Sequence, residues 1–209
     1  MSAPSAKRRL RPAPSLVVDG LAVRRGRRAI VESLSLVHSV GRVAWLVGEN
    51  GGGKSSLMRV LAGVARPSAG SVRHDAPEHS HARRAYYHPD MRLPSAVHVS
   101  DWQALVARLD LPERENPGLT PPFARPGIPA SDLSTGEEKR LILEAVLATG
   151  RDFVFLDEPF EHLSVEGKAL LAERLGRLAR SRVVVVATNQ GIPPALTGGP
   201  VIRLEPADG

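Results

Sequence analysis

A glycine-rich turn that ends in Lys-Ser carries the clearest chemical signal in the sequence. Residues 48–56 fit the phosphate-binding pattern G-x-x-x-x-G-K-[ST] at every fixed position. Glycines let successive backbone N–H groups curve around an anion, and the N-terminus of a following helix adds partial positive charge. We expect Lys54 to reach the outer phosphates and Ser55 to offer its hydroxyl to Mg²⁺. The turn therefore predicts a nucleoside triphosphate site formed by Gly48, Glu49, Asn50, Gly51, Gly52, Gly53, Lys54, Ser55 and Ser56.

A second set of chemical groups follows an apolar run late in the chain. Residues 152–156 predict a buried strand that ends in Asp157 and Glu158. Ligands of open α/β sheets bind at the carboxyl ends of the strands. Asp157 is expected to hold Mg²⁺ through water, and Glu158 to polarise the attacking water. Taken alone, such a pair is more often a surface turn.

The elements that must position these groups follow from hydrophobic periodicity. The apolar run 43–47 predicts a buried strand before the glycine-rich turn, and Leu57, Leu61 and Val64 predict a helix after it that ends near residue 66. This context disfavours the alternative of a glycine-rich loop with a chance lysine. Further strands are predicted at 16–18, 21–23, 33–37, 70–73, 183–187 and 201–204, and helices at 101–110, 136–149 and 165–180.

The order of these elements predicts an α/β fold with a phosphate-loop core and a mainly parallel sheet. Asp-Gly and Arg-Gly-Arg turns separate the first three strands, which predicts a small N-terminal antiparallel subdomain. A helical subdomain is expected at about residues 89–150. Its first helix has a predicted capping box between Ser100 and Gln103, and the helix at 165–180 has Ser164 as its predicted N-cap.

A third motif identifies the class of triphosphatase. Residues 133–141 read Leu-Ser-Thr-Gly-Glu-Glu-Lys-Arg-Leu, which resembles the LSGGQ signature of ATP-binding cassette ATPases. The resemblance covers the chain from about residue 16. It implies that Ser134 and Gly136 of one subunit close over the γ-phosphate held by another, so that two cassettes sandwich ATP. It also implies a separately encoded transmembrane partner and a peripheral location at the cytoplasmic face of the membrane.

The departures from this family concern the residues that couple binding to hydrolysis. Arg25 stands near the position of an adenine-stacking aromatic residue, and its planar guanidinium is a candidate substitute. A glutamine that touches Mg²⁺ is missing, so His88 or Asp90 would stand in, and Asp90 is assigned to the metal. Asn189 replaces a histidine that orients the γ-phosphate and water. With Lys54 and Glu158 present, we expect slow ATP hydrolysis.

Composition limits the other possibilities. The chain has 209 residues, no cysteine and a net charge of +6, and no apolar run long enough to cross a bilayer. Eight of its 28 basic residues lie in two short runs, and the other 20 are balanced by 22 acidic residues. We therefore expect a disordered basic leader at 1–14, a single domain at 15–209 and no nucleic-acid partner.

Some alternatives remain open at this stage. The histidines around residues 74–88 could ligate a metal, although a solvated loop is the simpler interpretation. The chain could be a degenerate regulatory cassette that pairs with a competent one, or a cassette that acts on nucleic acid or ribosomes. The short length and residues 188–193 are similar to the haem-exporter ATPases of cytochrome c maturation.

Overall fold

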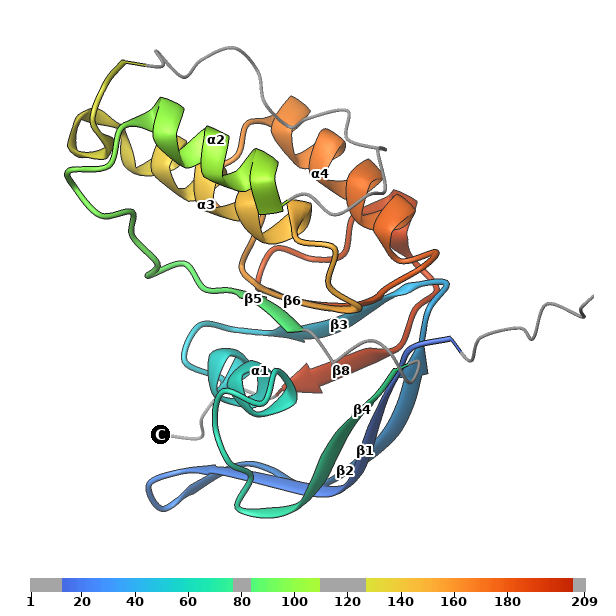
Figure 1. The fold of residues 1–209 in the computed structure, drawn as a ribbon. Helices are drawn as coiled ribbons and strands as arrows, with labels where there is room; N and C mark the ends of the chain where they lie inside the picture. The colour runs from blue at the N-terminus through green and yellow to red at the C-terminus, as the bar shows by residue number, and fades with distance from the viewer. Residues whose placement is uncertain (1–12, 77–83, 110–126, 205–209) are drawn as a thin grey trace, which may run out of the picture.

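The computed structural model describes residues 13–76, 84–109 and 127–204 (Figure 1). The predicted leader therefore lies almost wholly outside the described residues, as do His79, His81 and residues 110–126 of the expected helical subdomain. Within the described ranges, two sheets and four α-helices surround the predicted phosphate loop.

A five-stranded parallel sheet forms the centre of the molecule. Its strands lie in the order β5-β6-β7-β3-β8. Every residue of β6 and β7 is buried, as expected for strands covered on both faces. This confirms the α/β class and the parallel sheet, with bounds β3 Val43–Gly48, β5 Arg84–Tyr87, β6 Phe153–Asp157, β7 Val183–Thr188 and β8 Val201–Leu204.

A three-stranded antiparallel sheet contains two strands that precede the phosphate loop in the chain and one that follows α1. Its order is β2-β1-β4, with β1 Ser15–Arg25, β2 Arg28–Ser39 and β4 Ala69–Asp75. The expected turn at Asp19-Gly20 is wrong: Gly20 has φ 53°, and the pairing register shifts there without ending the strand. The residue pair forms a bulge because both strand halves continue to pair with β2 and β4.

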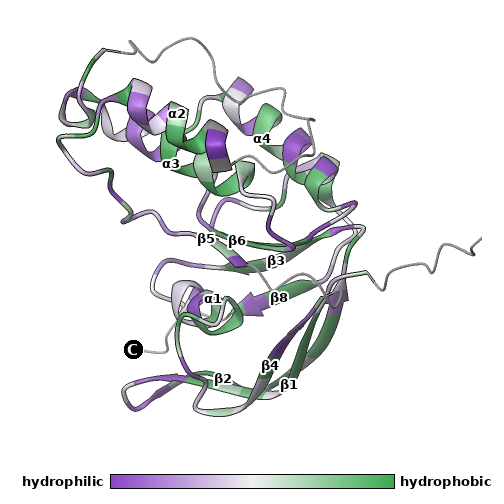
Figure 2. Ribbon diagram, in the orientation of Figure 1, coloured by the Kyte–Doolittle hydropathy of each residue, from purple (hydrophilic) through white to green (hydrophobic). Residues whose placement is uncertain are grey.

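The two faces of the five-stranded sheet are covered by different layers (Figures 1 and 2). Alternate residues of β6 belong to different layers. Val154 and Leu156 pack with residues of α3 and α4 on one face. Phe153 and Phe155 pack on the other face, with α1 and the inner side of the three-stranded sheet. The hydropathy view shows α1 between the two sheets, so the helix that follows the phosphate loop is anchored from both sides.

The helices agree with prediction except near their ends. They are α1 Lys54–Leu61, α2 Val99–Leu109, α3 Thr135–Ala148 and α4 Val165–Leu178, with short 3₁₀ turns at Ala130–Asp132 and Pro194–Leu196. α1 ends earlier than expected because Gly63 is left-handed, with φ 70°.

The predicted N-cap of α2 is wrong, and the predicted N-cap of α4 is confirmed. α2 begins at Val99, so Ser100 lies inside its first turn and is not the expected cap. Its Trp102 packs against the core, but Leu105 is 48% exposed, so the apolar face of α2 is only partly buried. Ser164 does cap α4, where its Oγ accepts from the N–H of Gly167 at 3.1 Å. No described helix is long and apolar enough to span a membrane.

Replacing Leu156 by alanine tests the central layer. Leu156 has no exposed surface and lies one residue before Asp157. We expect Leu156→Ala to lower the free energy of unfolding by about 2–5 kcal/mol, since it leaves a cavity in a packed core. Leu170→Ala in α4, where the side chain is 48% exposed, should change it by less than about 0.5 kcal/mol. Urea unfolding measures both, and equal losses would contradict this account of the core.

Candidate functional site

The phosphate loop connects β3 to α1 and ends at the N-terminus of that helix. Gly53 occupies the N-cap position with φ 98°, and no side chain caps the first turn of α1. A β-carbon at Gly53 would also lie 2.5 Å from the Cγ2 atom of Ile30. Glycine is therefore required here by backbone conformation and by space, and the N–H groups of α1 stay available to an anion.

Two contacts from outside the loop hold its tip. The guanidinium of Arg28 donates to the carbonyl of Gly51 at 3.3 Å, and the side-chain amide of Asn189 donates to Oδ1 of Asn50 at 2.8 Å. Neither Arg28 nor the Asn189–Asn50 pair follows from local sequence patterns, because both bring together segments far apart in the chain. The loop is thus fastened to the β1–β2 hairpin and to the end of β7.

Lys54 is held by oxygen atoms on three sides. Its Nζ donates to the carbonyls of Gly48 and Glu49 at 2.9 and 3.0 Å and lies 3.1 Å from Oε1 of Glu158. The lysine is only 6% exposed and Glu158 13%. The structure therefore brings together the two residues predicted to bind phosphate and to activate water, as an ion pair.

Glu158 has a constrained backbone and a second partner. Its φ is 50°, and its Oε2 accepts from the backbone N–H of Asn189 at 3.1 Å. Burial raises the pKa of Glu158, and the hydrogen bond from Asn189 and the neighbouring Lys54 oppose that rise. Asn189 therefore lies where its main chain can orient the carboxylate while its side chain holds the phosphate loop.

Asp157 is the least compensated charge of the site. It has no exposed surface, and neither carboxylate oxygen has a hydrogen-bond partner of good geometry. Burial raises the pKa of Asp157, and the nearby Ser55 hydroxyl is the largest influence opposing that rise. An unpartnered buried carboxylate beside a hydroxyl suits a bound divalent cation.

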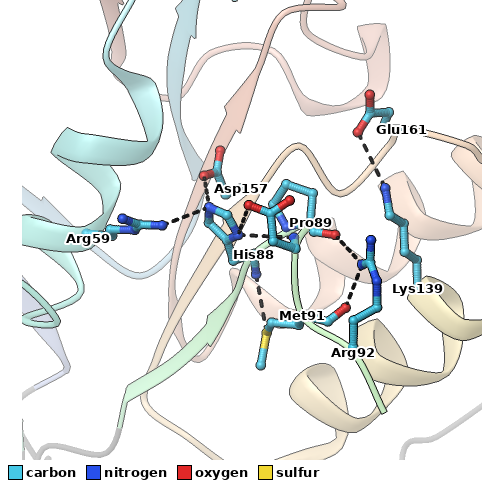
Figure 3. Close-up of polar contacts among 9 residues, drawn as sticks. Arg59, His88, Pro89, Met91, Arg92, Lys139, Asp157 and Glu161 are labelled. Atoms are coloured by element: carbon cyan, nitrogen blue, oxygen red, sulfur yellow. Dashed lines mark hydrogen bonds and ion pairs between the residues drawn. The ribbon is translucent and has the colours of Figure 1, made fainter. Parts of the chain in front are cut away.

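His88 lies next to Asp157 (Figure 3). Tyr87 pairs with Leu156, so the residues that follow each of them are adjacent at the sheet edge. His88 Nε2 is 3.8 Å from Oδ2 of Asp157, and Asp90 contacts the other side of the ring at 3.4 Å. Among the described residues, no group of three histidine or acidic side chains could hold a metal ion by itself.

The signature segment begins α3 on the exposed side of the molecule. Ser134 forms the capping box with Glu137: its Oγ accepts from the N–H of Glu137 at 3.3 Å, and its own N–H donates to Oε2 at 2.8 Å. Ser134 is exposed and Gly136 half-buried. Neither has a hydrogen bond to residues 48–56 among the described contacts, so this chain does not bring the signature to its own phosphate loop.

α3 is nevertheless tied to the site region. Lys139 lies 3.8 Å from Glu161, which follows the Asp157-Glu158 pair (Figure 3). Oε1 of Glu138 accepts from the N–H of Leu93 at 2.7 Å. Arg25 lies at the exposed end of β1, opposite Arg28 in the hairpin. Of these two arginines, Arg28 is the one with a contact to the phosphate loop.

The buried charge of Asp157 predicts a cost to stability. A carboxyl group with a raised pKa binds more protons in the folded than in the unfolded chain, so the free energy of unfolding falls as pH rises through the folded pKa. Asp157→Asn should therefore raise the free energy of unfolding by about 1–3 kcal/mol at neutral pH in nucleotide-free protein, because an unpartnered buried charge is removed. The gain should shrink as pH falls below the raised pKa of Asp157 and should vanish below the ordinary carboxyl pKa.

Urea unfolding from acidic to neutral pH measures this gain. Asp19→Asn, at an exposed carboxylate in β1, is the matched control and should show no such trend. A loss of stability in Asp157→Asn at neutral pH would mean that other groups compensate the buried charge.

Comparison with known proteins agrees with this geometry. The chain is 38% identical over 177 residues to the cytochrome c biogenesis ATP-binding export protein CcmA of Novosphingobium aromaticivorans, covering 84% of this chain and 88% of the relative. It is 33% identical over 181 residues to the protein of the same name from Rhodopseudomonas palustris, covering 81% and 89%.

Solved structures show the same fold. A putative ATP-binding protein of an ABC transporter from Pyrococcus furiosus superposes with a TM-score of 0.69 at 15% identity, covering 91% of this chain and 97% of that one. A bacterial Atm1-family exporter with ATP bound superposes with a TM-score of 0.65 at 19% identity, covering 91% and 37%. The family model described as ABC transporter matches residues 31–161, and the chain belongs to this family of ATP-binding cassette proteins.

Proposed function

We propose that this chain is the nucleotide-binding subunit of a transporter and that it hydrolyses ATP slowly to drive a separate membrane protein. The observation that carries the proposal is the meeting of Lys54, Asp157 and Glu158 at the carboxyl end of the parallel strands. Phosphate binding, cation binding and water activation need these three groups close together. The relatives named as ATP-binding export proteins support a transport role.

The nucleotide phosphates would lie against the main chain of residues 48–56. The uncapped N–H groups of α1 face that position, and Lys54 can reach the outer phosphates once it leaves Glu158 and the loop carbonyls. Phosphate oxygens would then replace the oxygens that now surround Nζ. The exposed guanidinium of Arg25 is proposed to stack on the base.

The residues present fit a divalent cation. Asp157 offers a buried carboxylate whose oxygens lack partners, and Ser55 offers a hydroxyl beside it. Asp90, the other residue assigned to the metal, contacts His88 and is 86% exposed, so it would act from outside. Bound Mg²⁺ would neutralise charge on the phosphates.

Glu158 is proposed to accept a proton from the attacking water. The N–H of Asn189 holds one oxygen of this carboxylate, and Lys54 holds the other in nucleotide-free protein. Moving Lys54 to a phosphate would free that oxygen to act as a base. Asn189 can donate a hydrogen bond to the γ-phosphate but carries no charge, which is why slow turnover is expected.

The exposed N-terminus of α3 is proposed to complete the site of a second cassette. Ser134 and Gly136 lie at this helix end and make no hydrogen bond to the phosphate loop of their own chain. Two cassettes facing each other would bring this helix end to the γ-phosphate held by the partner. The membrane protein would hold the pair at the cytoplasmic face, with the cassette bound peripherally.

Asn189→His tests the proposed cause of slow turnover. Restoring a charged γ-phosphate donor should raise ATP hydrolysis by about 10², the effect of one positioned donor at a developing charge. Gln190→His, which places the same side chain one residue later, is the matched control and should not raise the rate. Phosphate release with the membrane partner present measures both.

Glu158→Gln identifies the base in the same assay. This substitution should reduce hydrolysis to background without preventing ATP from binding. Equal background rates in wild type and Glu158→Gln would instead mean that the cassette only binds nucleotide, as a regulatory subunit would.

A further inference from the structure

His88 and Asp157 form an adjacent pair at the edge of the parallel sheet. Parallel pairing of β5 with β6 aligns Tyr87 with Leu156, so the next residue of each strand emerges at the same level. The imidazole is 13% exposed and the carboxylate 0%, and Nε2 is 3.8 Å from Oδ2 (Figure 3). A nitrogen ligand thus stands beside a buried carboxylate that lacks hydrogen-bond partners.

A neighbouring cation lies at the ring nitrogen that faces Asp157. The Nη2 atom of Arg59 lies 3.3 Å from Nε2 of His88, and a guanidinium can only donate hydrogen bonds. In this contact Nε2 accepts from Arg59, which corresponds to the tautomer with the ring proton on Nδ1. The space beside Nε2 and Asp157 already attracts a positive group, and the exposed side chain of Arg59 can leave it.

The other ring nitrogen faces Asp90. Oδ2 of Asp90 lies 3.4 Å from Nδ1, and a carboxylate in that position favours the tautomer with the proton on Nδ1. The backbone N–H of Asp90 also points to Nδ1 at 3.1 Å, which favours the opposite tautomer. A metal cation at Nε2 would select the tautomer with the proton on Nδ1, because a cation repels an N–H group and binds through the nitrogen lone pair.

We propose that His88 is a direct ligand of the divalent cation at Asp157, so that the nucleotide site prefers a borderline cation such as Co²⁺ over Mg²⁺. The proposal rests on the proposed function, since the nucleotide phosphates must supply the remaining ligands. Imidazole suits the later first-row metals, whereas Mg²⁺ favours an all-oxygen set. Asp90 then acts as the outer carboxylate that orients the ring.

The first test is spectroscopic. Full-length protein is incubated with Mn²⁺ and an ATP analogue that has a non-hydrolysable β–γ bond, and pulsed electron paramagnetic resonance is used to detect nitrogen coupled to the metal. We expect an imidazole nitrogen coupling in wild type and its loss in His88→Gln, because a glutamine ligates through oxygen. His98→Gln, at an exposed histidine at the start of α2, is the matched control and should retain the coupling.

The second test compares cation affinities by calorimetry with the same analogue. Relative to wild type, His88→Gln should lower the preference for Co²⁺ over Mg²⁺ by about tenfold. Asp90→Asn, at a side chain that is 86% exposed and outside the core, should lower Co²⁺ affinity in the same direction. This variant keeps the test decisive if His88→Gln fails to fold.

The outcomes separate the two proposals. One outcome is that the analogue binds, wild type shows no nitrogen coupling, and the ratio of Co²⁺ to Mg²⁺ affinity is the same in both variants as in wild type. This outcome would overturn the role of His88 and leave the proposed function standing. Failure of the analogue to bind with any cation would overturn the proposed function itself.

Discussion

Uncompensated negative charge at the carboxyl end of β6 is the constraint on which the site depends. Asp157 and Glu158 are both withdrawn from water, and Lys54 is the one described cation with an ion pair to Glu158. A protein selected only for stability would not keep Asp157 buried without a partner. The surrounding elements hold this arrangement in place: α1 is packed between two sheets, and Asn189 ties the end of β7 to the phosphate loop.

The nucleotide-free arrangement also explains how binding can be coupled to catalysis. Lys54 has one ammonium group and two classes of partner, the oxygens that now surround it and the phosphates of a nucleotide. The lysine cannot satisfy both at once. Binding of phosphate would therefore release Glu158 from its ion pair at the moment when a base is needed, while the N–H of Asn189 keeps the carboxylate oriented.

Local patterns were enough to predict most of the framework. The phosphate loop, β6 with its terminal carboxylates, and the Ser134 start of α3 depend on spacing within a few residues, and each lies where expected. Asp19-Gly20 was misread because the same dipeptide serves a turn or a bulge, and pairing with two neighbouring strands decides which. Leu105 of α2 is 48% exposed, because an apolar periodicity does not tell how much of a helix face is covered.

The contacts that give this site its individual character could not be derived from the sequence. His88 was considered as a substitute for a missing glutamine, but its place against Asp157 depends on the register between β5 and β6. That register pairs Tyr87 with Leu156.

 No local pattern reports such a pairing between strands so far apart in the chain. The same holds for Arg59 and Arg28, which reach His88 and Gly51 from other elements.

The most direct test of the central claim is calorimetric titration of ATP with Mg²⁺ into wild type and Lys54→Ala. In this account, residues 48–56 bind the phosphates and Lys54 leaves Glu158 to contact them. Wild type should then bind ATP, and Lys54→Ala should bind it at least about tenfold more weakly, because a hydrogen bond to a charged group contributes about 1.5–3 kcal/mol. Equal affinities, or no binding by wild type, would contradict the account.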